Sequence, residues 1–223
     1  MKAKGLRFVF DDLQDLIQKS LYQGVFYEED ELDIISKFIK KDAVIIDVGA
    51  NIGNHAIYFD KFLSPKTVYV IEPISRAITM MLQNIALTYS HTINLDYIGL
   101  ALSDKMCYTT PNTTCEHNLG ATTFREILPE ENIDVENFGF KTVTGDSIFE
   151  NLIVDFIKID VEGMELKVLD GFKETIRKNK PIIFIEVSLD HFYKFNEWLS
   201  INEYQIKIEQ NHGGYNNYLI LPI

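Results

Sequence analysis

A short loop in the first third of the chain has the residue types of a nucleotide-binding turn. The segment "VIIDVGANIGNHAIYF" (44–59) is an apolar run that contains Asp47 and continues through Gly49, Asn51 and Gly53 into a helical pattern. Glycine directly after a buried strand favours a tight turn or a close approach of the backbone to a ligand. Since open α/β sheets bind ligands beyond the carboxyl ends of their strands, the loop predicts a ligand at the mouth of such a sheet.

The same loop lacks the two common phosphate-binding patterns. His55, not a lysine, lies near the second glycine, so the loop is not G-x-x-x-x-G-K-[ST]. Asn51 occupies the place of the middle glycine of G-x-G-x-x-G, which impairs the approach of a pyrophosphate and disfavours an NAD-linked enzyme. Glu72 ends the next apolar run, where a carboxylate holds ribose hydroxyls in such folds. Together with Asp47, these features suit an adenosine ligand without phosphates.

Carboxylates also follow two later strand candidates. Asp160 and Glu162 lie in "VDFIKIDVEG", Glu165 follows in the next helix, and Glu186 ends "PIIFIE". A carboxylate beside a hydroxyl can act as a general base, and neighbouring carboxylates raise one another's pKa toward neutrality. Asp160 is the first candidate base and Glu162 the second. The same oxygen atoms also suit Mg²⁺, so the sequence leaves a metal site open.

Other titratable side chains have two interpretations each. His191 could act as a base because its unperturbed pKa lies near neutrality, or it could belong to a helix start that Asp190 caps. We interpret His55 as a packing or capping residue and Lys158 as an edge or pairing residue of its strand. Trp198 lies on an amphipathic pattern and is expected in the core.

Strand-like and helix-like runs alternate from residue 44 onward, which is typical of βαβ units. The pattern predicts an α/β fold: a Rossmann-like, seven-stranded, mostly parallel sheet with an antiparallel last strand and helices on both faces. The strands are expected at 43–48, 67–73, 93–103, 154–163, 181–188, 204–210 and 217–223, and helices through residue 62 and at 75–89, 164–179 and 191–203.

Two segments depart from this alternation within what we expect to be a single domain, 1–223. Residues 1–42 are an N-terminal helical segment, with apolar spacing of three and four in 10–21 and 28–41. Residues 104–146 are a polar insertion after the third strand, with short strands expected near 122–124 and 141–144. Such an insertion is either a lid or substrate loop that shapes an acceptor site, or a surface hairpin.

Composition limits the partners. The formal net charge of −12 argues against a nucleic-acid partner. The sequence has no long apolar run for a membrane span and no signal-peptide core, so we expect an intracellular, soluble, cytoplasmic protein. Cys107 and Cys115 are interpreted as free thiols, with a disulfide as the alternative. The oligomeric state stays open.

The glycine loop resembles that of class I S-adenosylmethionine (SAM)-dependent methyltransferases. Within that superfamily, "IIDVGANIGNHAIYF", "VIEP", "ALSD", "KIDVEGME" and "PIIFIE" together resemble the FkbM family, over roughly residues 24–222. The resemblance implies SAM as the cofactor and a donor site made of Asp47, Gly49, Asn51, Gly53, Glu72, Ser103 and Asp104. In it the glycine loop approaches the amino-acid end and the ribose, and Asp47 lies near the methionine amino group or orders the loop. Glu72 takes the ribose diol, while Ser103 and Asp104 meet the adenine edge.

The resemblance also implies the reaction. Family members mainly O-methylate hydroxyls of sugars, glycans and secondary metabolites, so we expect a SAM-dependent O-methyltransferase acting on a sugar or glycan hydroxyl. Methylation of a non-sugar small-molecule hydroxyl or amine is the alternative enzyme, and a non-catalytic SAM-binding module is the alternative from another class. The stretch "HNLGA" (117–121) resembles a family feature too, which implies that Asn118 and Gly120 line the site.

Overall fold

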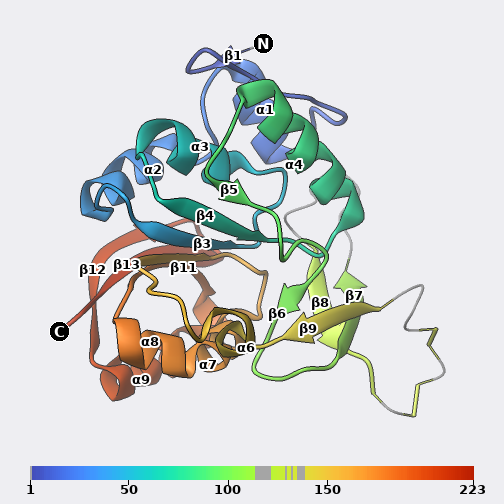
Figure 1. The fold of residues 1–223 in the computed structure, drawn as a ribbon. Coiled ribbons are helices and arrows are strands. Elements are labelled where there is room, and N and C mark those ends of the chain that lie inside the picture. The colour runs from blue at the N-terminus through green and yellow to red at the C-terminus, as the bar shows by residue number, and fades with distance from the viewer. Residues whose placement is uncertain (1, 114–121, 129, 132, 135–138) are drawn as a thin grey trace.

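The computed structural model describes residues 2–113, 122–128, 130–131, 133–134 and 139–223 (Figure 1). Its central sheet has seven strands in the order β12–β13–β11–β10–β3–β4–β5. The pairs from β11 to β5 are parallel, and β13 is antiparallel to both of its neighbours. The predicted sheet, with its antiparallel last strand, is therefore confirmed. The strands are β3 (Val44–Val48), β4 (Thr67–Ile71), β5 (Ile93–Asn94), β10 (Phe156–Ile159), β11 (Ile182–Ser188), β12 (Tyr204–Asn211) and β13 (Tyr215–Pro222).

The two central strands explain why the sheet forms. Every residue of β3 and of β10 is buried, as expected for parallel strands that are covered on both faces and rich in Ile and Val. Asp47 is the one charged residue of β3 and Lys158 the one charged residue of β10, and the strand register places them opposite each other.

Helices cover both faces of the sheet, as predicted (Figure 1). One face packs against α1 to α4 through a core that includes Phe26, Phe59 and Met81. The other face packs against α6 to α9 around Phe149 and Phe172. The helices are α1 (Leu16–Gln23), α2 (Glu29–Ile35), α3 (Asn54–Phe62), α4 (Ser75–Thr88), α6 (Gly145–Phe149), α7 (Glu165–Gly171), α8 (Lys173–Asn179) and α9 (Phe192–Asn202), with short 3₁₀ helices at Ser36–Phe38 and Leu189–His191.

The predicted strand at 93–103 is wrong as a single element. It is divided into β5 in the main sheet and β6 (Ala101–Leu102) in a second sheet. The Asn94 side chain accepts a hydrogen bond from the backbone N–H of Asp96 at 3.0 Å, which turns the chain out of the first strand. Gly99 then has φ +83° and donates its N–H to the backbone oxygen of Glu72. These local hydrogen bonds replace the hydrogen bonds to a neighbouring strand that would continue β5.

Two helix expectations also need correction. The predicted helix at 164–179 is interrupted at Phe172, between α7 and α8. Asp190 does not cap the helix after β11. Helix α9 begins after His191, and no side chain caps its first turn. Instead, Leu189–His191 forms one 3₁₀ turn between the strand and the helix.

The two departing segments carry the elements predicted for them and some that were not. The second sheet has the order β6–β9–β7–β8, where β8 (Thr123–Glu126) and β9 (Phe140–Val143) match the two predicted short strands. Strand β7 (Tyr108–Thr113) was not predicted. At the N-terminus, α1 and α2 fall in the predicted helical stretches and follow a two-strand ladder, β1 (Lys2–Ala3) with β2 (Leu6–Arg7).

Some expectations fall partly outside the described residues. Asn118, Gly120 and Cys115 lie in the range that the structure does not describe. Among the residues it does describe, Cys107 forms no disulfide. None of the helices in the described ranges combines the length and the apolar character needed to cross a bilayer.

Candidate functional site

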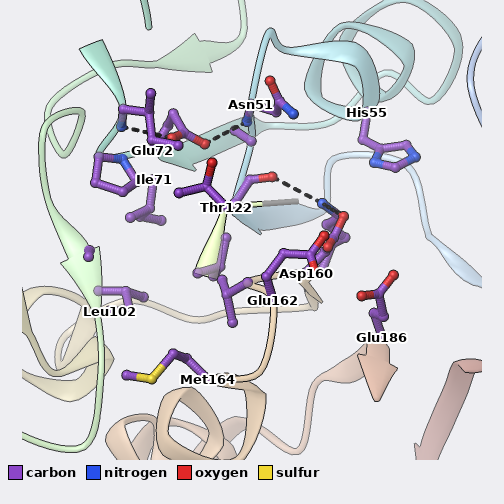
Figure 2. A pocket seen from close by; sticks show the side chains of 18 of the residues that line it. Asn51, His55, Ile71, Glu72, Leu102, Thr122, Asp160, Glu162, Met164 and Glu186 are labelled. Atoms are coloured by element: carbon purple, nitrogen blue, oxygen red, sulfur yellow. Dashed lines mark hydrogen bonds and ion pairs between the residues drawn. The ribbon is translucent and has the colours of Figure 1, made fainter. Parts of the chain in front are cut away.

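A cavity of about 300 Å³ opens at the carboxyl ends of β3, β4, β10 and β11. This volume reaches the lower end of the range of small-molecule sites. Figure 2 shows Asn51 and Glu72 on one side of the cavity and Asp160, Glu162 and Glu186 on another. The position agrees with the sequence-based expectation that the ligand lies at this mouth of the sheet.

The loop after β3 lies against the end of β10. Gly49 has φ +77°, and a Cβ atom on it would lie 1.8 Å from the backbone oxygen of Asp160, so only glycine fits there. Gly53 has φ +84° and precedes α3, but it is not among the residues that line the cavity. Asn51 does line it, has φ +49°, and its buried Oδ1 has no hydrogen-bond partner among the described residues. A ligand that donates a hydrogen bond would satisfy this oxygen.

Glu72 is buried at the end of β4 and lines the cavity. Its Oε2 accepts the backbone N–H of Asn51 and its Oε1 that of Ile74, both at 2.8 Å (Figure 2). Burial raises the pKa of Glu72 to about 7, and the two backbone bonds oppose that rise. Each carboxylate oxygen can accept a second hydrogen bond, so the group can also hold hydroxyls of a ligand.

A buried ion-pair network lies beneath the loop. Lys158 Nζ is 3.5 Å from Asp47 Oδ1 and 3.1 Å from Asp160 Oδ2, and it donates to the backbone oxygen of Gly49 at 3.2 Å. Burial alone would lower the pKa of Lys158, but the charges of Asp160 and Asp47 outweigh it and hold the pKa above its usual value. Lys158 is thus a pairing residue. It lies on a central strand and not at an edge of the sheet, which corrects that part of the expectation.

Three carboxylates gather where β10 and β11 end. Oxygen atoms of Asp160, Glu162 and Glu186 all lie within 4.8 Å of one another. Burial, then the charge of Asp160, raises the pKa of Glu162 to about 7 and that of Glu186 to about 9. Glu162 has φ +52°, a strained conformation for a non-glycine residue. Strain of this kind concentrates at functional sites, and the raised pKa values suit proton acceptance or the binding of one cation.

The expected site residues divide into two groups. Gly49, Asn51, Glu72, Asp160 and Glu162 line the one cavity. The other expected residues, which are not among its lining, are Asp47, Gly53, Ser103, Asp104 and His191.

The structure gives neighbours for the last three of these. Ser103 is buried and donates its hydroxyl to Asp104 Oδ1 at 2.9 Å, next to Ala101 and Leu102, which do line the cavity. His191 Nδ1 is 4.0 Å from Glu165 Oε2. Roles for Ser103, Asp104 and His191 stay predictions.

Sequence reasoning missed part of the lining. Tyr27 and Glu28 reach the cavity from the N-terminal segment, and Tyr215 reaches it from β13. His55, interpreted as a packing residue, stacks on Phe59 but also lines the cavity, with Nε2 3.3 Å from Glu28 Oε2. The insertion contributes further lining residues, which are Thr109, Thr122, Phe124 and Thr142. The family resemblance, which begins near residue 24, covers Tyr27 and Glu28, and an acceptor site shaped by residues 104–146 was one of the two expectations for the insertion.

Known proteins resemble this chain in sequence or in fold. A curated relative, the hexuronic acid methyltransferase AglP of Haloferax volcanii, is 27% identical over 167 residues, which are 73% of this chain and 64% of that protein. The crystal structure of methyltransferase FkbM from Methylobacillus flagellatus superposes with a TM-score of 0.57 and 21% identity, over 86% of this chain and 46% of that one. A putative methyltransferase from Streptococcus mutans in complex with SAH superposes with a TM-score of 0.55 and 10% identity, over 87% and 97%.

The chain thus spans less than two thirds of the length of the first two proteins. The family described as "Methyltransferase FkbM domain" matches residues 47–215, a range that begins near the end of β3 and ends at Tyr215 in the cavity wall. The chain belongs to the FkbM methyltransferase family.

Proposed function

We propose that this chain is a SAM-dependent O-methyltransferase that transfers a methyl group to a hydroxyl of a sugar or glycan. One observation carries the proposal: a single cavity is lined by a loop suited to an adenosine ligand and by carboxylates suited to a hydroxyl. The archaeal relative is a hexuronic acid methyltransferase, which supports a sugar as the acceptor.

The donor side of the cavity fits SAM in its polar groups. Glu72 has acceptor capacity left for the ribose hydroxyls, and Asn51 Oδ1 offers an unused acceptor beside it. Gly49 lets the loop backbone run close to the ligand without a side chain in the way. When bound, SAM supplies a methyl group on a positively charged sulfur, which keeps the bonding electron pair as the methyl group leaves.

Carboxylates on the opposite side would activate the acceptor. The acceptor oxygen forms its bond to the methyl carbon in line with the breaking carbon–sulfur bond, and its proton moves to a carboxylate. Asp160 is our first choice for this base, because it lines the cavity and Lys158 fixes its carboxylate at 3.1 Å. Glu162, with a pKa raised by burial to about 7, is the second choice.

Measurements of ligand binding and of turnover test the proposal. Calorimetry should show that SAM binds the folded protein and NAD does not, and Glu72→Ala should weaken SAM binding. Asp160→Asn should keep the melting temperature but cut turnover, whereas Glu197→Gln, on an exposed helix face, serves as the charge-matched control. A folded protein that fails to bind SAM would disprove the proposal. Turnover that EDTA abolishes and Mg²⁺ restores would assign the cluster of Asp160, Glu162 and Glu186 to a metal instead.

A further inference from the structure

Helix α1 begins with a half-exposed leucine at the cavity. Leu16, the first residue of α1, is 52% exposed, yet it lines the cavity together with Ile17. The lining includes two more apolar residues, Pro73 and Ile74, which follow Glu72 directly in the chain. Exposed leucines are common on protein surfaces, so the place of Leu16 in a ligand cavity is the feature that needs a physical reason.

Hydrogen bonds fix the turn that carries this leucine. The side chain of Gln18 is buried, and its Oε1 accepts the backbone N–H groups of Asp11 at 2.8 Å and Asp12 at 3.1 Å. Its Nε2 donates to Asp11 Oδ1 at 2.9 Å. Asp15 caps α1 by accepting the backbone N–H of Gln18 at 3.0 Å. The backbone of Leu16 is therefore held by its neighbours, although the Leu16 side chain is half exposed.

The same N-terminal stretch is attached to the donor side of the cavity. Asp11 Oδ2 accepts a hydrogen bond from Arg76 Nε, in the first turn of α4, at 2.8 Å. Asn84 of α4 accepts the backbone N–H of Val9 at 2.8 Å and donates to the backbone oxygen of Ile52 at 3.0 Å. The stretch is thus joined to the loop after β3 and to the start of α4, which are the two parts of the chain that flank the donor site.

The covalent structure of SAM indicates which part of the donor meets the apolar lining. In the proposed function, Glu72 holds the ribose hydroxyls and the methyl group points toward Asp160. The sulfur and the adenine are attached on opposite sides of the ribose ring, so the adenine lies on the Glu72 side, away from Asp160. Figure 2 shows Ile71 and Leu102 on that side of the cavity. Adenine is a flat ring whose two faces suit an apolar pocket.

We infer that Leu16 and Ile17 cover the adenine ring of SAM, and that the contact with Leu16 strengthens donor binding. The ring removes the exposed part of the Leu16 side chain from water, which is favourable, and the fixed turn before α1 means that little order is lost. The inference rests on the proposed function, in which SAM is the donor. It assigns donor binding to a segment that precedes the family match over residues 47–215.

Calorimetry with two adenosine ligands tests the inference. SAH is SAM without the transferred methyl group, and 5′-methylthioadenosine also lacks the amino-acid end. Leu16→Ala truncates a half-exposed side chain, and we expect the affinity for both ligands to fall about three- to tenfold. Leu13→Ala is the matched control, because Leu13 is 45% exposed in the same segment and is not among the lining residues. Leu16→Met keeps the side-chain volume and should retain the parental affinity.

Each outcome decides between the role of Leu16 and another explanation. Unchanged SAH affinity in Leu16→Ala, or an equal loss in Leu13→Ala, overturns the inference. A loss for SAH without a loss for 5′-methylthioadenosine places Leu16 at the amino-acid end of the donor and overturns it as well. If the folded parent binds neither SAM nor SAH, the proposed function itself fails. Parental binding that Leu16→Ala leaves intact refutes only the role of Leu16.

Discussion

Lys158→Met removes the positive charge at the centre of the sheet. Lys158 is 3% exposed, and Asp47 opposite it is 0% exposed, with no hydrogen bond to either carboxylate oxygen from the described residues. The ammonium at 3.5 Å is therefore what compensates the Asp47 charge. Breaking a buried ion pair by removing one partner costs about 3–5 kcal/mol of unfolding free energy. For a chain of this length that corresponds to a drop of roughly 6–20 °C in melting temperature.

Scanning calorimetry at neutral pH measures this drop in melting temperature, and two matched variants serve as comparisons. Lys40→Met removes an exposed ion pair with Asp155 at 2.8 Å, which is worth at most about 1 kcal/mol. The double variant Lys158→Met/Asp47→Asn should be more stable than Lys158→Met alone, because the stranded charge is gone. Asp47→Asn is measured alone as well. If the double variant loses as much unfolding free energy as Lys158→Met and Asp47→Asn lose in sum, Asp47 does not depend on Lys158 and the reasoning fails.

Further predictions concern the loop and the acidic cluster. Gly49→Ala should cost about 2–5 kcal/mol of unfolding free energy, from its left-handed backbone and the clash with Asp160, whereas Gly99→Ala, with φ +83° and open space, should cost about 1–2 kcal/mol. Equal losses in denaturant titrations would contradict the close approach. Because burial holds the pKa of Glu162 and Glu186 above their unfolded values, both bind protons in the folded state that the unfolded chain has released. Their contribution to stability is complete below about pH 4.5 and is lost as pH rises through about 7 and 9. The unfolding free energy of Glu186→Gln relative to the parent should thus increase over that range. A difference that does not change with pH would be evidence against a raised pKa of Glu186.

Strands of the sheet could be predicted from the sequence where burial determines them. They could not be predicted where local hydrogen bonds end a strand. The runs at β3, β10 and β11 are mostly buried, apolar and rich in β-branched residues, so their strands were predicted. The stretch at 93–103 is equally apolar in part, but the bond from Asp96 to the Asn94 side chain and the left-handed Gly99 divide it. Such a division depends on single contacts, which the spacing of apolar residues in the sequence does not reveal.

The candidate site shows the same contrast between near and distant residues. Gly49, Asn51 and Glu72 follow directly from strands in sequence, so their place at the mouth of the sheet was predictable. Lys158 opposite Asp47 was not, because that pairing requires the strand order that places β10 beside β3. The contributions of Tyr27, Glu28 and Tyr215 to the cavity depend on packing between the two ends of the chain, for which the sequence offers no local signal.

The strand β10 links the two halves of the site physically. Its end lies so close to Gly49 that no side chain fits between them, and its Lys158 binds both the backbone of that loop and the Asp160 carboxylate. A shift of the loop must therefore move the carboxylate, and the reverse holds as well. Under the proposed function, a variant such as Lys158→Met should change the KM for SAM and kcat together. An effect on only one of the two constants would mean that the loop and the carboxylate move independently.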